Sequence, residues 1–185
     1  MQHLEVSVEY NGIVIYDPSV LAAHYGGGPP EGTNLFQRYV TTDEGDEVLR
    51  AGVVVPVLAI DDAGSEVVVR TAGEAYSHDA HVVHRNHGFA LRVAEAALVT
   101  DLYSLIDWSP PASAEWHALE LAAGLYRVDV DAFSQYEPGR GIVSAGYIFT
   151  FDRRAEVPEV TADTGAYMRV FDQPPGAGGA VPRPT

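Results

Sequence analysis

Four of the seven histidines lie within ten residues, at His78, His81, His84 and His87. Neutral imidazole is the commonest metal ligand, and a spacing of three would place all four on one side of a helix or 3₁₀ turn. On a strand, alternation would instead send them to opposite faces in pairs. A zinc site needs three or four convergent ligands, and only His117 and scattered carboxylates could complete this set. A metal site is therefore the alternative hypothesis, and partly exposed imidazoles in a polar loop are favoured.

Asp129 and Asp131 are the second pattern that could do chemistry. Two residues apart on a strand, their side chains share one face at roughly 7 Å, close enough for a catalytic carboxylate pair. Alternating charges are also typical of the solvated face of any strand, and we favour that interpretation. Nucleophilic catalysis has no support, because the chain contains no Cys and no Ser in a Gly-x-Ser-x-Gly turn. The sequence thus predicts no catalytic residue and no enzyme activity.

The densest acidic run has four carboxylates in five residues around a central glycine. Its spacing does not follow the twelve-residue calcium loop with a terminal Glu. Such a run could bind a basic protein, because complementary charge accelerates and orients association; the alternative is a solvated turn. A second acidic turn, Asp61-Asp62, follows the predicted strand Val53–Ile60. The predicted partner-binding residues are Asp43, Glu44, Asp46, Glu47, Asp61 and Asp62.

The charge of the whole chain supports a basic partner. There are 26 acidic residues against 11 basic ones, all of them Arg, and the formal net charge is -15. Such a charge repels nucleic acid and anionic lipid, whose binding proteins usually carry basic patches. The acidic residues are concentrated in the N-terminal third of the chain, where residues 1–62 contain ten Asp and Glu against two Arg. Solubility alone is the other explanation of this composition.

Composition also sets the expected class of protein. At 185 residues the chain suits one domain that can bury a core without outside help. Without Cys it can form neither disulfides nor thiolate metal sites. The N-terminus lacks the pattern of a signal peptide, and no segment approaches 18 uncharged apolar residues. We therefore expect a cytoplasmic protein without a cofactor.

The clearest structural signal is the stretch Leu119–Phe133. From Tyr126 its even positions are apolar while Arg127, Asp129 and Asp131 are charged, which is the period of a strand with one wet face. Tyr147–Phe151 looks like its antiparallel partner. Six side chains are predicted to face the core between two sheets: Tyr126, Val128, Val130, Tyr147, Phe149 and Phe151.

The first 70 residues predict two hairpins. The first hairpin is indicated by three features: the alternation over Leu4–Tyr10, the turn signal Asn11-Gly12 and the apolar segment Ile13–Tyr16. The second joins Val53–Ile60 to Glu66–Arg70 through a polar turn. Val53–Ile60 is apolar on both faces, as in a strand buried on two sides, and its Pro56 favours an edge position or a bulge.

Other segments are less regular. Ser19–Thr33, with its Gly-Gly-Gly-Pro-Pro run, is predicted to be a surface loop, and Phe36–Tyr39 the start of a strand. Phe89–Asp107 fits helical spacing as well as strand alternation at its start, so both remain open. Tyr167–Phe171 is a candidate last strand. We expect one domain over residues 1–172 and a disordered Pro/Gly/Ala tail over residues 173–185.

The order of these segments resembles a family of bacterial β-sandwich proteins similar to the competence-associated inhibitor of the DNA-entry nuclease. The resemblance covers Leu4–Phe133. It rests on a first strand pair ending in Tyr16-Asp17, the strand-turn-strand region around Val53–Arg70, the Gly88–Val93 segment and the Leu121–Val128 passage with its aliphatic-x-x-Gly-x-Tyr-x-aliphatic pattern. It implies an all-β, two-layer antiparallel sandwich with irregular loops and room for one short helix, and the strand interpretation of Phe89–Val93.

In function, the same resemblance implies a small protein that binds and blocks another protein. Together with the acidic composition, it predicts an inhibitor or immunity protein whose partner is a basic nuclease or toxin. No site residue can be carried over from the family, because no functional motif is matched. The alternative is a metal-binding protein or metalloenzyme that uses the histidines between His78 and His87.

Overall fold

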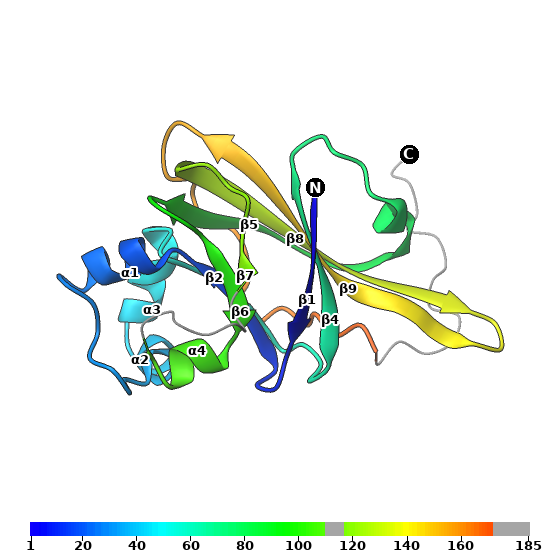
Figure 1. The fold of residues 1–185 in the computed structure, drawn as a ribbon, viewed down its shortest axis with the longest axis horizontal. Helices are drawn as coiled ribbons and strands as arrows, with labels where there is room; N and C mark the ends of the chain where they lie inside the picture. The colour runs from blue at the N-terminus through cyan, green and yellow to red at the C-terminus, as the bar shows by residue number, and fades with distance from the viewer. Residues whose placement is uncertain (110–116, 172–185) are drawn as a thin grey trace.

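The computed structural model describes residues 1–109 and 117–171, which form a mostly β fold with two sheets. In Figure 1 the α-helices lie together on one side of the molecule, and the β8–β9 hairpin projects from the other. The strands are β1 (Gln2–Ser7), β2 (Gly12–Tyr16), β3 (Val54–Leu58), β4 (Gly64–Thr71), β5 (Val82–Val93), β6 (Leu98–Asp101), β7 (His117–Ala118), β8 (Gly124–Glu137) and β9 (Gly141–Arg154). The helices are α1 (Pro18–His24), α2 (Leu35–Thr41), α3 (Glu44–Arg50), the 3₁₀ helix η1 (Ser77–His81) and α4 (Tyr103–Ile106).

The larger sheet has the strand order β1-β4-β9-β8-β5 and is organised around β8, which pairs antiparallel with both neighbours. The alternation that begins at Tyr126 is the β8 alternation, so this strand prediction is confirmed. All six predicted core residues, three on β8 and three on β9, are at most 5% exposed. They pack against apolar side chains of the smaller sheet, such as Ile13, Val55 and Val99.

The prediction of wholly antiparallel sheets is wrong at one junction. Strand β4 runs parallel to β9, with Glu66 opposite Gly146 and Thr71 opposite Phe151. Parallel neighbours need a long crossover connection rather than a tight turn, and here some 70 residues separate the two strands. Local alternation carries no information about a pairing at that distance.

The two predicted hairpins are corners between the sheets instead. Strand β1 pairs with β4 in the larger sheet, whereas β2 pairs with β3 and β6 in the smaller one. The β3–β4 connection likewise changes sheet. The two corners hold each other, because Val8 N–H donates to the carbonyl of Ala63 and the Asn11 side chain donates to the carbonyl of Ile60. The strands were predicted correctly, but their partners were not.

The smaller sheet, in the order β3-β2-β6-β7, is the middle of three layers. One face packs on the larger sheet, and the other carries Val14, Tyr16 and Val54 against α1, α2, α3 and α4. All five residues of β2 are therefore buried. The predicted burial on both faces is confirmed for Val53–Val55 and Val57, whereas Leu58 is half-buried and Ala59 is exposed. Pro56 lies on β3 at a sheet edge as expected.

The helical layer was missed by the sequence analysis, which expected one short helix at most. Phe36–Tyr39 lies in α2 rather than in a strand, and residues 19–24 of the predicted loop lie in α1. The start signals were present: Asp17 caps α1 with Pro18 at its first position, and the Asn34 side chain accepts from Gln37 N–H at the start of α2. The Gly26–Pro30 stretch does lie outside regular structure.

Two segments near the middle and the end of the chain remained open in the sequence. Phe89–Asp107 contains the end of β5, all of β6 and α4, so the strand interpretation of Phe89–Val93 is the correct one. Tyr167–Phe171 is not a strand, although Met168 and Val170 are buried. The predicted tail, residues 173–185, lies outside the described residues, and so does the domain limit at residue 172.

Candidate functional site

The predicted acidic run begins a helix and faces a groove. The groove, of about 300 Å³, is lined by α2, α3, α4 and β3, with apolar side chains such as Phe36, Leu58 and Leu105. Asp46 of the acidic run also lines it. The groove lies on the helical side of the molecule (Figure 1). The groove therefore offers an apolar floor beside carboxylates.

The central glycine of the run is explained by packing rather than by metal binding. A Cβ atom on Gly45 would lie 2.1 Å from the carbonyl oxygen of Tyr39, which belongs to α2. Helices α2 and α3 can approach this closely only because residue 45 has no side chain. The close approach brings the acidic start of α3 against α2.

Glu44, one of the predicted partner-binding residues, points inward. Its carboxylate accepts hydrogen bonds from the Tyr25 hydroxyl at 2.5 Å and from Arg38 at 2.7 Å. Burial alone would raise the pKa of Glu44, but these two partners outweigh it and the pKa lies below its usual value. Desolvation in the same cluster raises the pKa of Tyr39 to about 12. Glu44 thus stabilises the contact between the helices.

The other three acids of the run face solvent. Asp43, Asp46 and Glu47 are exposed, and their spacing of three and four places them on one side of the first turn of α3. Asp43 makes no capping hydrogen bond. Asp46 forms an ion pair with Arg50, in which both side chains are more than 65% exposed, so this pair is easily exchanged for another. We call these three carboxylates the acidic helix surface.

Asp61 and Asp62 lie at the sheet corners, where their carboxylates accept hydrogen bonds from backbone N–H groups, two at Asp61 and one at Asp62. The Asp61 carboxylate accepts from Val170 and Phe171, and Asp62 accepts from Asn11 at 2.6 Å. Asp62 is exposed as well, whereas Asp61 is partly buried. The structure therefore separates the predicted partner-binding residues into those that hold the fold and those available to a partner.

The four clustered histidines do not converge. His78 packs between the rings of Tyr76 and Phe133, and His84 meets the ring of Tyr167 edge-on. The ring centroids of His78 and His81 are 5.9 Å apart. Across residues 1–109 and 117–171, no three His, Asp or Glu side chains are placed to hold a metal ion. The geometry gives the metal hypothesis no support.

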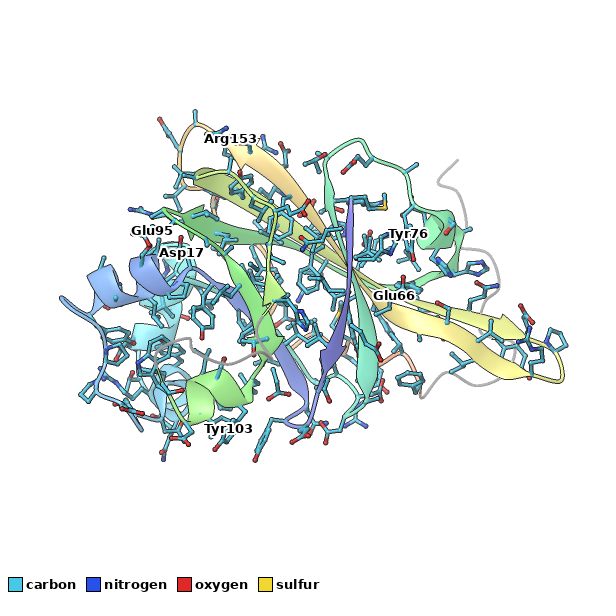
Figure 2. All side chains as sticks on the ribbon, in the orientation of Figure 1. Asp17, Glu66, Tyr76, Glu95, Tyr103 and Arg153 are labelled. Atoms are coloured by element: carbon cyan, nitrogen blue, oxygen red, sulfur yellow. The ribbon has the colours of Figure 1, made fainter. Side chains whose placement is uncertain are left out.

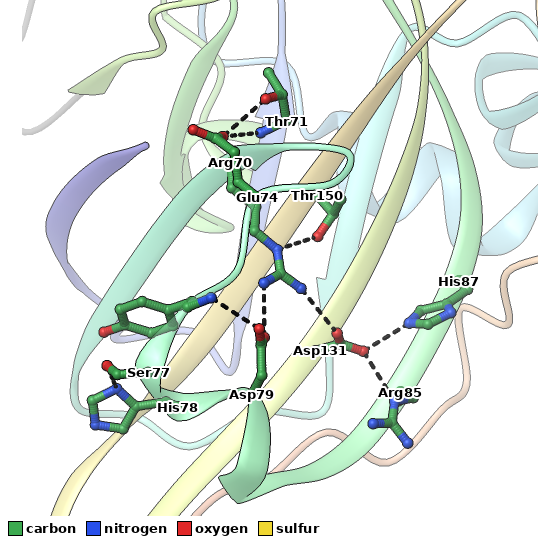
Figure 3. Close-up of polar contacts among 11 residues, drawn as sticks. Arg70, Thr71, Glu74, Ser77, His78, Asp79, Arg85, His87, Asp131 and Thr150 are labelled. Carbon is green, nitrogen blue, oxygen red and sulfur yellow. Dashed lines mark hydrogen bonds and ion pairs between the residues drawn. The ribbon is translucent and has the colours of Figure 1, made fainter.

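His87 belongs to a network of charges on the outer face of the larger sheet (Figure 3). Its Nε2 lies 2.7 Å from Asp131 Oδ1, and Arg70 lies between Asp131 and Asp79 of η1. Arg70 also donates to the Thr150 hydroxyl at 2.8 Å. The network ties η1 to strands β4, β5, β8 and β9. Its charges are matched within the chain.

The pair Asp129 and Asp131 is used in the same way. Asp129 accepts from the backbone N–H of Gly88, at the irregularity between His87 and Phe89 of β5, and from Arg127. Asp131 carries the histidine and arginine contacts described above. Both carboxylates are therefore occupied by neighbours, and their arrangement supports the interpretation of a structural strand face.

Asp17 is the polar residue that the sequence analysis missed. It is fully buried and accepts five hydrogen bonds: two from Ser19 and three from the backbone N–H groups of Ala94, Glu95 and Ala96. Figure 2 shows Asp17 next to Glu95 at the edge of the helical layer. Burial would raise its pKa, but the hydrogen bonds outweigh that effect and lower it. The Asp17-Pro18 pair is a helix-start signal that can be recognised in the sequence. The distant N–H groups that bind Asp17 cannot be recognised there.

None of the helices in the described parts of the chain is long and apolar enough to cross a membrane.

Comparison with known proteins adds one result about the fold. No protein-family model and no curated protein matches the sequence. Among solved structures, the chain is similar to ComJ from Bacillus subtilis, described as an inhibitor of the DNA-degrading activity of NucA. The match has a TM-score of 0.50 at 13% identity and covers 83% of this chain and 96% of ComJ. The resemblance stated from the sequence is thereby confirmed in structure: this chain has a fold similar to that of a bacterial nuclease inhibitor.

Proposed function

We propose that this protein binds a DNA-degrading nuclease and inhibits it. The observation that carries the proposal is the similarity of fold to ComJ, which extends over nearly all of that inhibitor. An identity of 13% establishes the fold alone. The proposed activity therefore needs support from the surface of this chain and a direct test.

Electrostatics supplies that support. A nuclease must present positive charge to the phosphates of DNA. A protein of net charge -15 is complementary to such a surface, and attraction between them speeds encounter. The acidic helix surface offers three exposed carboxylates beside an apolar groove. We propose that it faces the nuclease, with Asp43, Asp46 and Glu47 near basic residues of the DNA-binding site.

The test is a DNA-degradation assay with a purified NucA-type nuclease. Increasing amounts of this protein should abolish cleavage of linear DNA near an equimolar ratio, and calorimetry should show a complex. Val128→Asp, which places an unpaired charge in the core, should fold poorly and is the control for a specific effect. Undiminished cleavage with a tenfold excess of folded protein, and no heat of binding, would disprove the proposal.

A further inference from the structure

Two exposed tyrosines stack on each other at the corner where β1 leads into β2. The rings of Tyr10 and Tyr103 are 5.0 Å apart between centroids and inclined by 26°. Each of the two residues is 44% exposed. Figure 2 shows Tyr103, the first residue of α4, at the edge of the molecule. The preceding residue, Leu102, lines the groove, so the pair adjoins it.

The pair is held rigidly by one carboxylate. Asp101 accepts from the backbone N–H groups of Glu9 and Tyr10 through one oxygen, and from Tyr103 N–H at 2.6 Å through the other. The Tyr103 hydroxyl donates to Asp107 at 2.9 Å. Asp101 thus joins the β1–β2 corner to the β6–α4 junction. Both rings are positioned before any partner arrives, which lowers the entropy cost of binding.

The surroundings of the pair are acidic. Glu9, Asp62 and Asp107 are exposed, and Asp101 is half-buried. The three segments that build this corner, residues 9–12, 61–64 and 101–107, contain neither Arg nor Lys. The two tyrosine rings and the carboxylates next to them form a surface that we call the tyrosine patch. It consists of Tyr10 and Tyr103 with Glu9, Asp62, Asp101 and Asp107.

The charge of the patch selects one class of occupant. A second copy of this chain would bring eight carboxylates together in a symmetric contact, and nucleic acid or anionic lipid would be repelled. A basic protein surface is complementary. Its Arg or Lys side chains can lie over the tyrosine rings and pair with the carboxylates at the same time. Exposed tyrosines on rigid backbone are also typical binding hot spots.

We propose that the tyrosine patch is the anchor by which this protein grips its basic partner, with arginine or lysine side chains of the partner seated on Tyr10 and Tyr103. The inference rests on the proposed function for the identity of that partner, the nuclease. It adds a position in the interface distinct from the acidic helix surface. The helix surface attracts the partner over distance, and the tyrosine patch holds it.

The test compares Tyr10→Ala/Tyr103→Ala with Tyr136→Ala, using the same nuclease. Tyr136 is 46% exposed but lies on the β8–β9 hairpin, so it is a matched control. The double variant should bind at least about 30-fold more weakly, mainly through faster dissociation, and the control should bind within twofold of wild type. A double variant that binds and inhibits like wild type would overturn the inference while the proposed function stands. Failure of the wild-type protein to bind would instead remove the proposed function.

A measurement on the unaltered protein removes any dependence on how the variant folds. Hydroxyl-radical footprinting with mass spectrometry should show Tyr10 and Tyr103 protected in the complex and Tyr136 equally reactive with and without nuclease. A matched charge pair adds a second comparison. Glu9→Gln/Asp107→Asn should weaken binding about tenfold, while Glu156→Gln/Glu159→Gln, exposed acids elsewhere, should not. Tyrosines of the patch that stay reactive in a saturated complex would overturn the inference.

Discussion

The acidic side chains of this protein fall into two groups that differ in what they face. Asp17 and Asp61 turn toward the chain and accept hydrogen bonds from backbone N–H groups of distant segments. The acidic helix surface turns toward water. In the formal charge of -15, a carboxylate of either group counts as one negative charge. The difference teaches that net charge overstates what a partner can meet, because part of it holds the corners of the fold together.

Removal of Asp17 should have the largest effect on stability. Asp17→Ala removes a fully buried carboxylate and leaves the partly buried N–H groups of Ala94, Glu95 and Ala96 without this acceptor, and each lost hydrogen bond to a charged group costs about 1.5–3 kcal/mol. We expect the free energy of unfolding to fall by at least about 3 kcal/mol in urea denaturation. Asp43→Ala, an exposed carboxylate of the other group, is the control. Equal stabilities for the two variants would end the distinction between the groups.

Gly45 tests whether the contact between α2 and α3 is as close as the structure shows. Helix propensity alone predicts that Gly45→Ala stabilises the protein by up to about 1 kcal/mol. The clash with the Tyr39 carbonyl predicts the opposite, a loss of about 1–3 kcal/mol. The sign of the change in chemical denaturation decides. Stabilisation would mean that α2 and α3 are further apart and that the groove beside them has a different shape.

The pH dependence of stability should separate the groups as well. The pKa of Asp17 is lowered in the folded protein, so its contribution is present above the unfolded value of about 4 and is lost as the pH falls through the folded value. The stability difference between wild type and Asp17→Asn should therefore narrow from pH 7 to pH 3. A difference that is constant over this range would show that the charge of Asp17 contributes nothing.

Much of the fold was visible in local patterns. The alternation in β8, the double-sided burial of β3 and the edge position of Pro56 each follow from a few neighbouring residues. The pairing of strands did not. Asn11-Gly12 is a hairpin signal, yet the flanking strands enter different sheets. The decisive contacts are with Ala63, Asp62 and Asp101, which lie 51 to 92 positions from their partners in the chain.

The candidate site shows the same division. The acidic run could be read from the sequence, and its exposure on α3 is consistent with the predicted role, which is untested. That Glu44 points inward could not be read, because its partners Tyr25 and Arg38 come from other segments. The stacking of Tyr10 on Tyr103 also depends on a contact across more than 90 residues. Local spacing cannot reveal a surface assembled in this way.

The smallest effect on stability is expected for the acidic helix surface itself. Asp43→Asn/Asp46→Asn/Glu47→Gln changes only exposed side chains, and Glu44 is left intact because it holds the helices. Exposed charges at a helix start contribute little. The melting temperature should shift by less than about 3 °C in calorimetry. A larger loss would place these residues among the structural carboxylates.

The same variant gives the most direct test of the central claim, that outward carboxylates act on a basic nuclease. Stopped-flow association with the nuclease should be about tenfold slower for the variant than for wild type at low salt, with a smaller change in dissociation. The two association rates should converge toward 1 M salt, where the Debye length falls to about 3 Å. An association rate that depends neither on salt nor on these three carboxylates would contradict the account.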